Sequence, residues 1–187
     1  MQHGSDTLDL HGLWSKRTAA ILGSLAVLVG VDQLTKVWAI DNLKGQPGQS
    51  YLGDLIRIQY AENPGAFLSL GANLSHDSRF WLLSVTVGLF LLGCLGYLIW
   101  NRKLHPIATA GLTLIGGGGI SNLIDRLFRA QGRVIDFMNM GIGSLRTGIF
   151  NVADMVILLG VALLVFWNPA GPTDSEVEPG RKPAEKK

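Results

Sequence analysis

The sequence contains a repeated Asn-x-x-Asp pattern, once at Asn122 and Asp125 and again at Asn151 and Asp154. Residues three apart share a helix face, so each amide can hydrogen-bond near its carboxylate. A third acid, Asp136, follows two apolar residues, just before the last hydrophobic stretch. Two carboxylates a few ångströms apart cannot both ionise readily, so they share a proton and can activate a water molecule. The pattern indicates aspartic peptidase chemistry, with Asp125 and Asp136 both open as the partner of Asp154.

These acids lie in or beside hydrophobic stretches that predict membrane-spanning helices. Only 16% of the 187 residues are Asp, Glu, Lys or Arg, against about 25% in a soluble domain. About 20 apolar residues cross a bilayer as a helix. We therefore predict an all-α integral membrane protein with four transmembrane helices. The predicted spans are 18–40, 80–100, 107–124 and 149–167.

The remaining sequence predicts two tails and a small sheet. Residues 1–15 form a polar N-terminal tail, and residues 169–187 are rich in proline and alternating Glu and Lys, which favours disorder. The folded unit is then 16–168. After the first span, Ile56, Ile58 and Tyr60 alternate with polar residues, as in a half-buried strand. We expect a small extracytoplasmic β-sheet at the membrane surface.

Basic residues predict the orientation of the chain in the membrane. Lys16 and Arg17 precede the first span, and Arg102 and Lys103 separate the second and third. The positive-inside rule therefore puts both termini in the cytoplasm. The opposite loop nevertheless holds four arginines: Arg126, Arg129, Arg133 and Arg146. Either the orientation is wrong or these side chains bind lipid phosphates or carboxylates. We favour the second interpretation.

Ionisable residues inside a membrane are costly, so each one is a functional candidate until a partner explains it. Asp32 and Lys36 are four apart and can pair on one helix face. Asp125 can pair with Arg126 or Arg129. Both acids can therefore be structural.

Asp154 has no cation in its own span and remains the strongest functional candidate. Acids that only join helices, or a proton-relaying transporter, are the alternatives to a peptidase. Transporter sites usually lie near the bilayer midplane, whereas these acids lie near span ends, where a hydrolase can reach water. The glycines at 116–119 favour close helix packing, with local helix deformation as the alternative. The net charge of +2 does not favour nucleic acid binding.

Five motifs in order, over residues 15–168, resemble the lipoprotein signal peptidases, also called signal peptidase II. They are Asp32-Gln33-Leu34-Thr35-Lys36, Asn63-Pro64-Gly65-Ala66-Phe67, Asn122-Leu123-Ile124-Asp125-Arg126, Val134-Ile135-Asp136-Phe137 and Phe150-Asn151-Val152-Ala153-Asp154. The resemblance implies a multi-pass aspartic endopeptidase of the bacterial inner membrane. It would cleave prolipoproteins just before a diacylglyceryl-modified cysteine, with its active site toward the periplasmic face.

The resemblance also implies roles for individual residues. Asp136 and Asp154 correspond to the catalytic pair, which selects Asp136 over Asp125. Supporting positions are Asp32, Lys36, Asn63, Gly65, Asn122, Asp125, Arg126, Asn151 and Ala153. No metal or cofactor is implied, and a monomer, in contact with membrane phospholipid, is expected. A mobile extracytoplasmic helix is implied over 63–79, and Ser121 replaces the family's usual glycine.

From this assignment, Asn63, Asn122 and Asn151 are expected to hydrogen-bond the oxyanion or the substrate backbone.

Overall fold

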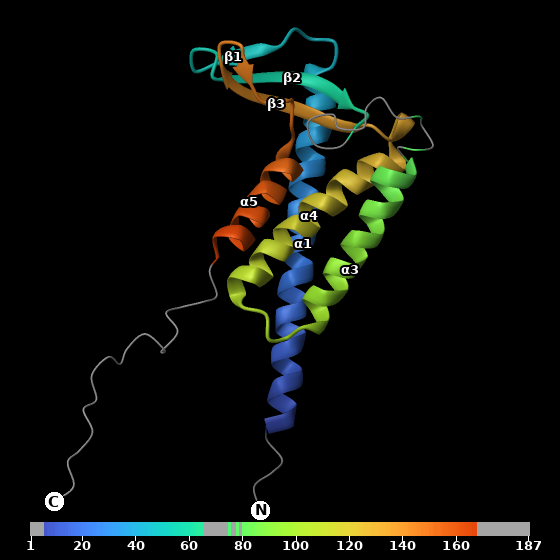
Figure 1. Ribbon diagram of the computed structural model, residues 1–187, viewed down its shortest axis with the longest axis vertical. Helices are drawn as coiled ribbons and strands as arrows, with labels where there is room; N and C mark the ends of the chain where they lie inside the picture. The colour runs from blue at the N-terminus through green and yellow to red at the C-terminus, as the bar shows by residue number, and fades with distance from the viewer. Residues whose placement is uncertain (1–5, 66–74, 76–77, 79, 168–187) are drawn as a thin grey trace, which may run out of the picture.

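The chain forms a bundle of helices with a small sheet across one end (Figure 1). The computed structural model describes residues 6–65, 75, 78 and 80–167, and only the backbone of residues 6–15 and 80. Helix α1 is the longest element, and a short π-helix, Phe80–Thr86, leads into α3. The α-helices are α1 (Asp6–Leu43), α3 (Val87–Trp100), α4 (Pro106–Phe128) and α5 (Val152–Phe166).

Three helical segments are long and apolar enough to cross a membrane: Lys16–Leu43, Trp81–Trp100 and Pro106–Phe128. Large apolar side chains cover their outer faces; Leu89 and Leu92, for example, are 65% and 67% exposed. Such a surface requires apolar surroundings. This is the surface of a membrane protein.

The predicted fourth span corresponds to α5, which has 15 residues. At 1.5 Å per residue, α5 is about 22 Å long, shorter than the roughly 30 Å hydrocarbon core of a bilayer. The four-span count therefore stays a prediction. As Figure 1 shows, α1 begins and α5 ends at the end of the bundle opposite the sheet.

Two helices extend beyond the predicted spans. The backbone of α1 is already helical at Asp6, within the segment predicted as a polar tail. Helix α4 continues to Phe128, so Asp125 and Arg126 lie inside it rather than after it. The predicted C-terminal tail, 169–187, and most of the predicted surface helix lie outside the described residues.

The sheet has four antiparallel strands in the order β1-β2-β3-β4. The expected strand containing Ile56, Ile58 and Tyr60 is confirmed as β2, which spans Ile56–Asn63. Strand β3 was not predicted, and it carries Asp136. The predicted small sheet is therefore present, with one more long strand than the sequence pattern indicated. The other strands are β1 (Gln49–Tyr51), β3 (Val134–Ile142) and β4 (Leu145–Arg146).

Apolar packing fixes the sheet on the bundle. Ala39 and Leu43, at the end of α1, form a buried cluster with Ile135 and Phe137 of β3. Alternate residues of a strand point to the same face, so the residue between these two, Asp136, points the other way. Packing on α1 therefore determines which face of β3 presents its carboxylate.

The glycines of α4 permit close helix contacts, as the packing interpretation predicted. A Cβ atom on Gly118 would lie 2.5 Å from the carbonyl oxygen of Ala153 in α5. A Cβ atom on Gly117 would lie 2.7 Å from Leu28 in α1. Helix α4 thus approaches both neighbours more closely than any larger residue allows.

Candidate active site

Asp136 is the third residue of β3, lies opposite Ala61 of β2, and is 1% exposed. Its Oδ1 accepts a hydrogen bond from Nδ2 of Asn151 at 2.6 Å, and its Oδ2 accepts one from Nδ2 of Asn63 at 2.9 Å. Burial, together with the negative charge of Asp154, raises the pKa of Asp136 to about 7, although the two amide hydrogen bonds oppose the rise. Asp136 can therefore hold a proton near neutral pH.

Asp154 is the third residue of α5 and belongs to a capping box with Asn151. The Asn151 side chain accepts a hydrogen bond from the Asp154 backbone N–H at 3.0 Å, and the Asp154 carboxylate accepts one from the Asn151 N–H at 3.2 Å. The other oxygen of Asp154 accepts a bond from Asn122 at 2.9 Å. Asn151 therefore contacts both carboxylates.

A buried cluster of ion pairs supports the Asp136 and Asp154 carboxylates. The Lys36 ammonium lies 2.7 Å from Asp32 and 2.9 Å from Asp125, and it donates to the Asn122 side-chain oxygen at 2.8 Å. Lys36, Asp32 and Asp125 are each at most 1% exposed. The expected pairing of Asp32 with Lys36 is confirmed. Because Lys36 holds the oxygen of Asn122, the amide nitrogen of Asn122 is left to point at Asp154.

Asp32 also fixes the start of α5. Its Oδ1 accepts a hydrogen bond from the backbone N–H of Ala153 at 2.7 Å. The first N–H groups of a helix have no partner within the helix and attract negative charge. Asp32 on α1 thus holds the helix turn that carries Asp154.

Two further residues of this network were absent from the predicted site. Ser121, which is fully buried, donates to Asp32 at 2.7 Å. Gln33 donates to the Ser121 hydroxyl at 3.0 Å and to Asp125 at 3.1 Å. Their positions offered a signal, since Gln33 is a polar residue inside a span and Ser121 is four residues before Asp125.

Asp125 is bound on several sides and is fully buried. Besides Lys36, it accepts a hydrogen bond from Arg129 at 2.7 Å and one from the backbone N–H of Ile135 at 3.3 Å. The expected pair with Arg129 is confirmed. Its neighbour Arg126 instead donates to the carbonyl oxygens of Gly65 and Gly132. The structural interpretation of Asp125 is therefore the better one.

The four arginines of the sheet-side loop bind groups of the protein itself. Arg126 and Arg129 have the partners described above, Arg133 pairs with Glu62 at 3.5 Å, and Arg146 donates to Asn139 at 2.6 Å. Arg129, Arg133 and Arg146 thus pair with carboxylates, as expected, whereas binding of lipid phosphates stays a prediction.

Asn63 is joined to the adjacent loop as well as to Asp136. Its side-chain oxygen accepts a hydrogen bond from the backbone N–H of Gly65 at 2.9 Å. The three asparagines expected to bind substrate all donate to the aspartates: Asn63 and Asn151 to Asp136, and Asn122 to Asp154. Hydrogen bonds from them to a substrate stay a prediction.

An apolar cavity of about 270 Å³ opens beside Asp154. Asn122 and Arg126 line its polar end, and Leu83, Leu158 and other apolar residues of three helices line the rest. Asp154 therefore lines a space that can accept an apolar chain. All eleven residues predicted for the site belong to one connected group of contacts, and Asn122, Arg126 and Asp154 of this group line the cavity.

Comparison with known proteins gives a consistent result. A sequence model of the family described as signal peptidase (SPase) II matches residues 24–168. The lipoprotein signal peptidase of Leifsonia xyli subsp. xyli is 36% identical over 163 residues, which cover 80% of this chain and 69% of the relative. That of Moorella thermoacetica is 36% identical over 163 residues, covering 85% of this chain and 97% of the relative.

A solved structure shares the fold. It is described as a bacterial membrane enzyme structure by the in meso method at 2.3 Å resolution. The TM-score is 0.65 at 23% sequence identity, over 79% of this chain and 85% of the other. The matched residues 24–168 contain all five motifs. The chain therefore belongs to the signal peptidase II family, whose members are aspartic peptidases.

Proposed function

We propose that the protein removes the signal peptide from diacylglyceryl-modified bacterial prolipoproteins, cleaving before the lipidated cysteine at Asp136 and Asp154. The names of the relatives support the substrate class. The observation that carries the mechanism is the position of Asn151, which donates to Asp136 through its side chain and to Asp154 through its backbone. A single residue thereby holds both carboxylates in one site.

In this mechanism the two aspartates share one proton. Asp136 is the protonated partner, which its raised pKa supports, and Asp154 is the general base. Asp154 takes a proton from a water molecule while the water oxygen bonds to the scissile carbonyl carbon. Asp136 gives its proton to the carbonyl oxygen. Collapse of the tetrahedral intermediate breaks the C–N bond. The leaving nitrogen receives a proton from Asp154, and a hydroxyl of the intermediate returns a proton to Asp136 as the carbonyl forms again.

The amide groups of Asn63, Asn122 and Asn151 orient the two carboxylates. A carboxylate with a donor at each oxygen has little freedom to rotate, and a pre-organised site pays no reorganisation cost at the moment of reaction. The amide donors therefore act through the aspartates.

The apolar cavity beside Asp154 supports a lipid-modified substrate. Its lining of helix side chains can take an acyl chain or apolar residues of the signal peptide, while Arg126 lies at the end nearest the carboxylates. Binding an apolar chain there places the adjoining peptide bond beside Asp154.

The location of the site favours hydrolysis over transport. Asp136 lies on the sheet, and Asp154 lies in the first turn of α5, next to it. We place this end at the periplasmic face and both termini in the cytoplasm, with four spans in the bacterial inner membrane. The basic residues at the other end of the bundle support this orientation.

The direct test mixes the full-length protein, purified in detergent, with a diacylglyceryl-modified prolipoprotein. We expect a smaller product on a gel, and mass spectrometry should find the lipidated cysteine at its N-terminus. The unmodified precursor is the matched control and should remain intact. Equal cleavage of both precursors, or a cut elsewhere in the chain, would contradict the proposed specificity.

A further inference from the structure

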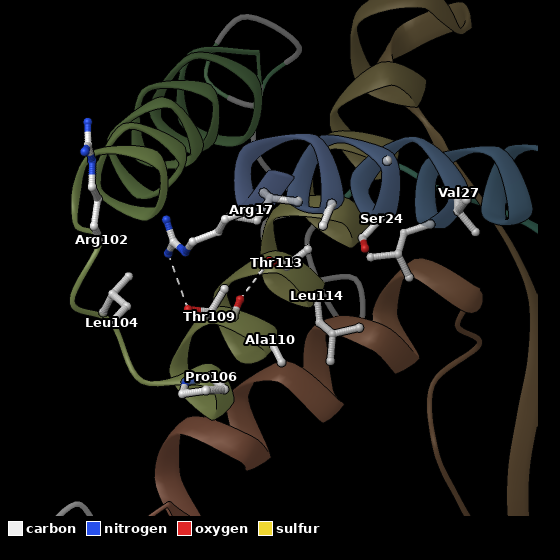
Figure 2. Close-up of a pocket in the computed structure, with 14 residues that line it drawn as sticks. Arg17, Ser24, Val27, Arg102, Leu104, Pro106, Thr109, Ala110, Thr113 and Leu114 are labelled. Atoms are coloured by element: carbon white, nitrogen blue, oxygen red, sulfur yellow. Dashed lines mark hydrogen bonds between the residues drawn. The ribbon is translucent and has the colours of Figure 1, made fainter. Parts of the chain in front are cut away.

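A second, larger cavity lies at the end of the bundle opposite the sheet. Its volume is about 1000 Å³, and α1 lines it on one side and the first turns of α4 on the other (Figure 2). Most of the wall is apolar, and Arg17 and Arg102 are the two charged residues among the described residues that line it. We refer to it as the α1–α4 groove. The proposed cleavage reaction does not use it.

The charge of Arg17 is not neutralised by an acid in the described part of the chain. Its Nη2 donates to the carbonyl oxygens of Leu98 and Asn101 at 3.1 and 3.4 Å, and to the hydroxyl of Thr109 at 3.4 Å. These acceptors are all neutral, and Figure 2 shows the guanidinium directed toward Thr109. Its Nη1 is buried and has no hydrogen-bond partner among the described residues.

Further positive charge surrounds this end of the groove. Lys16 and Lys103 are exposed neighbours of the two arginines in sequence, and Arg102 is exposed as well. The described residues that line the groove include no Asp or Glu. An uncompensated guanidinium beside an apolar surface is costly. The groove is therefore complementary to an anion that carries an apolar chain.

We propose that the α1–α4 groove binds one anionic glycerophospholipid, with its phosphate at Arg17 and Arg102 and an acyl chain along the apolar wall. The dimensions fit this ligand. From Arg17 to Val27, both in the lining, α1 advances by about 15 Å, which is half the thickness of the hydrocarbon core. A chain anchored at Arg17 thus extends to the middle of the bilayer. Free phosphate would leave the apolar wall uncovered.

Native mass spectrometry of the full-length protein in detergent, with phosphatidylglycerol and phosphatidylcholine of identical acyl chains, tests the proposal. Both lipids carry a phosphate, but the choline cation of phosphatidylcholine would be repelled by the arginines of the groove, so we expect phosphatidylglycerol to be retained about tenfold better or more. Arg17→Gln should remove most of this preference. Lys103→Gln, outside the groove lining, should retain it.

A second pair of variants tests the apolar wall without changing charge. A Cβ atom on Gly23 would meet no atom within 4 Å, and Gly23 lines the groove. Gly23→Leu therefore adds an apolar side chain to the groove from a Cβ position that meets no other atom, and it should reduce lipid retention. Gly30 is equally open but lies outside the lining, so Gly30→Leu is the matched control.

Several results would overturn the proposal. Equal retention of the two lipids would do so, as would unchanged retention in Gly23→Leu. A protein dimer that Gly23→Leu abolishes would assign the groove to a second copy. If the double variant Glu176→Gln/Glu178→Gln retained more lipid than the wild type, the acidic C-terminal segment would be the occupant of the groove. Displacement of the lipid by millimolar inorganic phosphate would show that the wall contributes nothing. None of these measurements depends on peptide cleavage.

Discussion

Nδ2 of Asn151 donates a 2.6 Å hydrogen bond to Oδ1 of Asp136, which lies 15 residues earlier in the chain and on a different element. Asn151 is also the N-cap of α5, where its side-chain oxygen accepts the N–H of Asp154. One amide thus joins a strand to a helix start. The stability of α5 and the position of the Asp136 carboxylate depend on different atoms of Asn151, so substitutions can separate them.

Asn151→Ser and Asn151→Ala should affect stability differently and activity alike. Serine is a good N-cap, whereas alanine there costs about 1 kcal/mol of stability. Neither can replace the amide donor on Asp136, so both should lose about tenfold or more in kcat/KM. Thermal unfolding in detergent and cleavage of a lipidated precursor provide the two measurements. Wild-type activity in Asn151→Ser would show that only the cap matters.

Asp136→Asn and Asp154→Asn should each abolish cleavage with little change in insertion or folding. Asparagine keeps the size of the side chain but cannot share a proton or act as a general base. We expect at least a 10³-fold loss of turnover, of the order seen when a catalytic group is removed. Asp54→Asn is the control, since Asp54 pairs with Arg57 on the sheet, away from the carboxylate pair. Substantial turnover by either active-site variant would exclude the pair.

The pH dependence of cleavage should follow the Asp136 proton. Burial raises the pKa of Asp136 to about 7, so the proton is held below that pH and lost above it. We therefore expect kcat/KM to fall as the pH rises through about 7. The Asn63 hydrogen bond stabilises the ionised form. Asn63→Ala should raise this pKa and move the fall to higher pH.

Asn42→Ala is the control for this shift, because Asn42 is exposed and donates to a backbone carbonyl of α1. Its pH profile should match that of the wild type. A profile that Asn63→Ala leaves in place, or moves to lower pH, would show that the titrating group is not Asp136.

Local sequence patterns predicted the parts of this site that depend on local geometry. Hydropathy located the helices, and four-residue spacing identified the Asp32–Lys36 pair, which is present at 2.7 Å. Alternation identified β2. These signals are strong because helix and strand periodicity fix which neighbours share a face.

Contacts between distant residues could not be derived in this way. Spacing left Asp125 and Asp136 as equal partners for Asp154. The two acids differ because of distant contacts. Asp125 is ion-paired with Lys36, which lies 89 residues earlier in the chain, whereas the pairing of β3 with β2 positions Asp136 in the site. Strand β3 itself was missed because three of its first four residues are apolar and buried, with no alternation to reveal a strand.

Lys36→Met should destabilise the fold strongly. The substitution removes the one cation that contacts both Asp32 and Asp125 among the described ion pairs, and leaves buried charge without compensation. Breaking a buried pair typically costs about 3–5 kcal/mol. Thermal unfolding in detergent should show a clearly lower midpoint. Lys44→Met is the control, because its partner Glu62 is also solvent-accessible and the pair adds little. Similar midpoints for the two variants would contradict a structural role for the buried cluster.

Gly118→Ala should displace the start of α5 and, with it, Asp154. The added Cβ atom would lie 2.5 Å from the Ala153 carbonyl oxygen and 2.7 Å from Ile157. Overpacking of this kind costs about 1–3 kcal/mol, and because the contact is with backbone, the helix itself must move. We expect lower stability and a larger relative loss of kcat, since small displacements of reacting groups are costly.

Gly96→Ala in α3 provides the matched control for this glycine. Its Cβ atom would meet nothing within 4 Å, so only helix propensity changes, which favours alanine by up to about 1 kcal/mol. Gly96→Ala should therefore keep full activity with equal or higher stability. Full activity in Gly118→Ala would show that the close approach of α4 to α5 does not position Asp154. The hydrogen bond from the Ala153 N–H to Asp32 would then hold that turn alone.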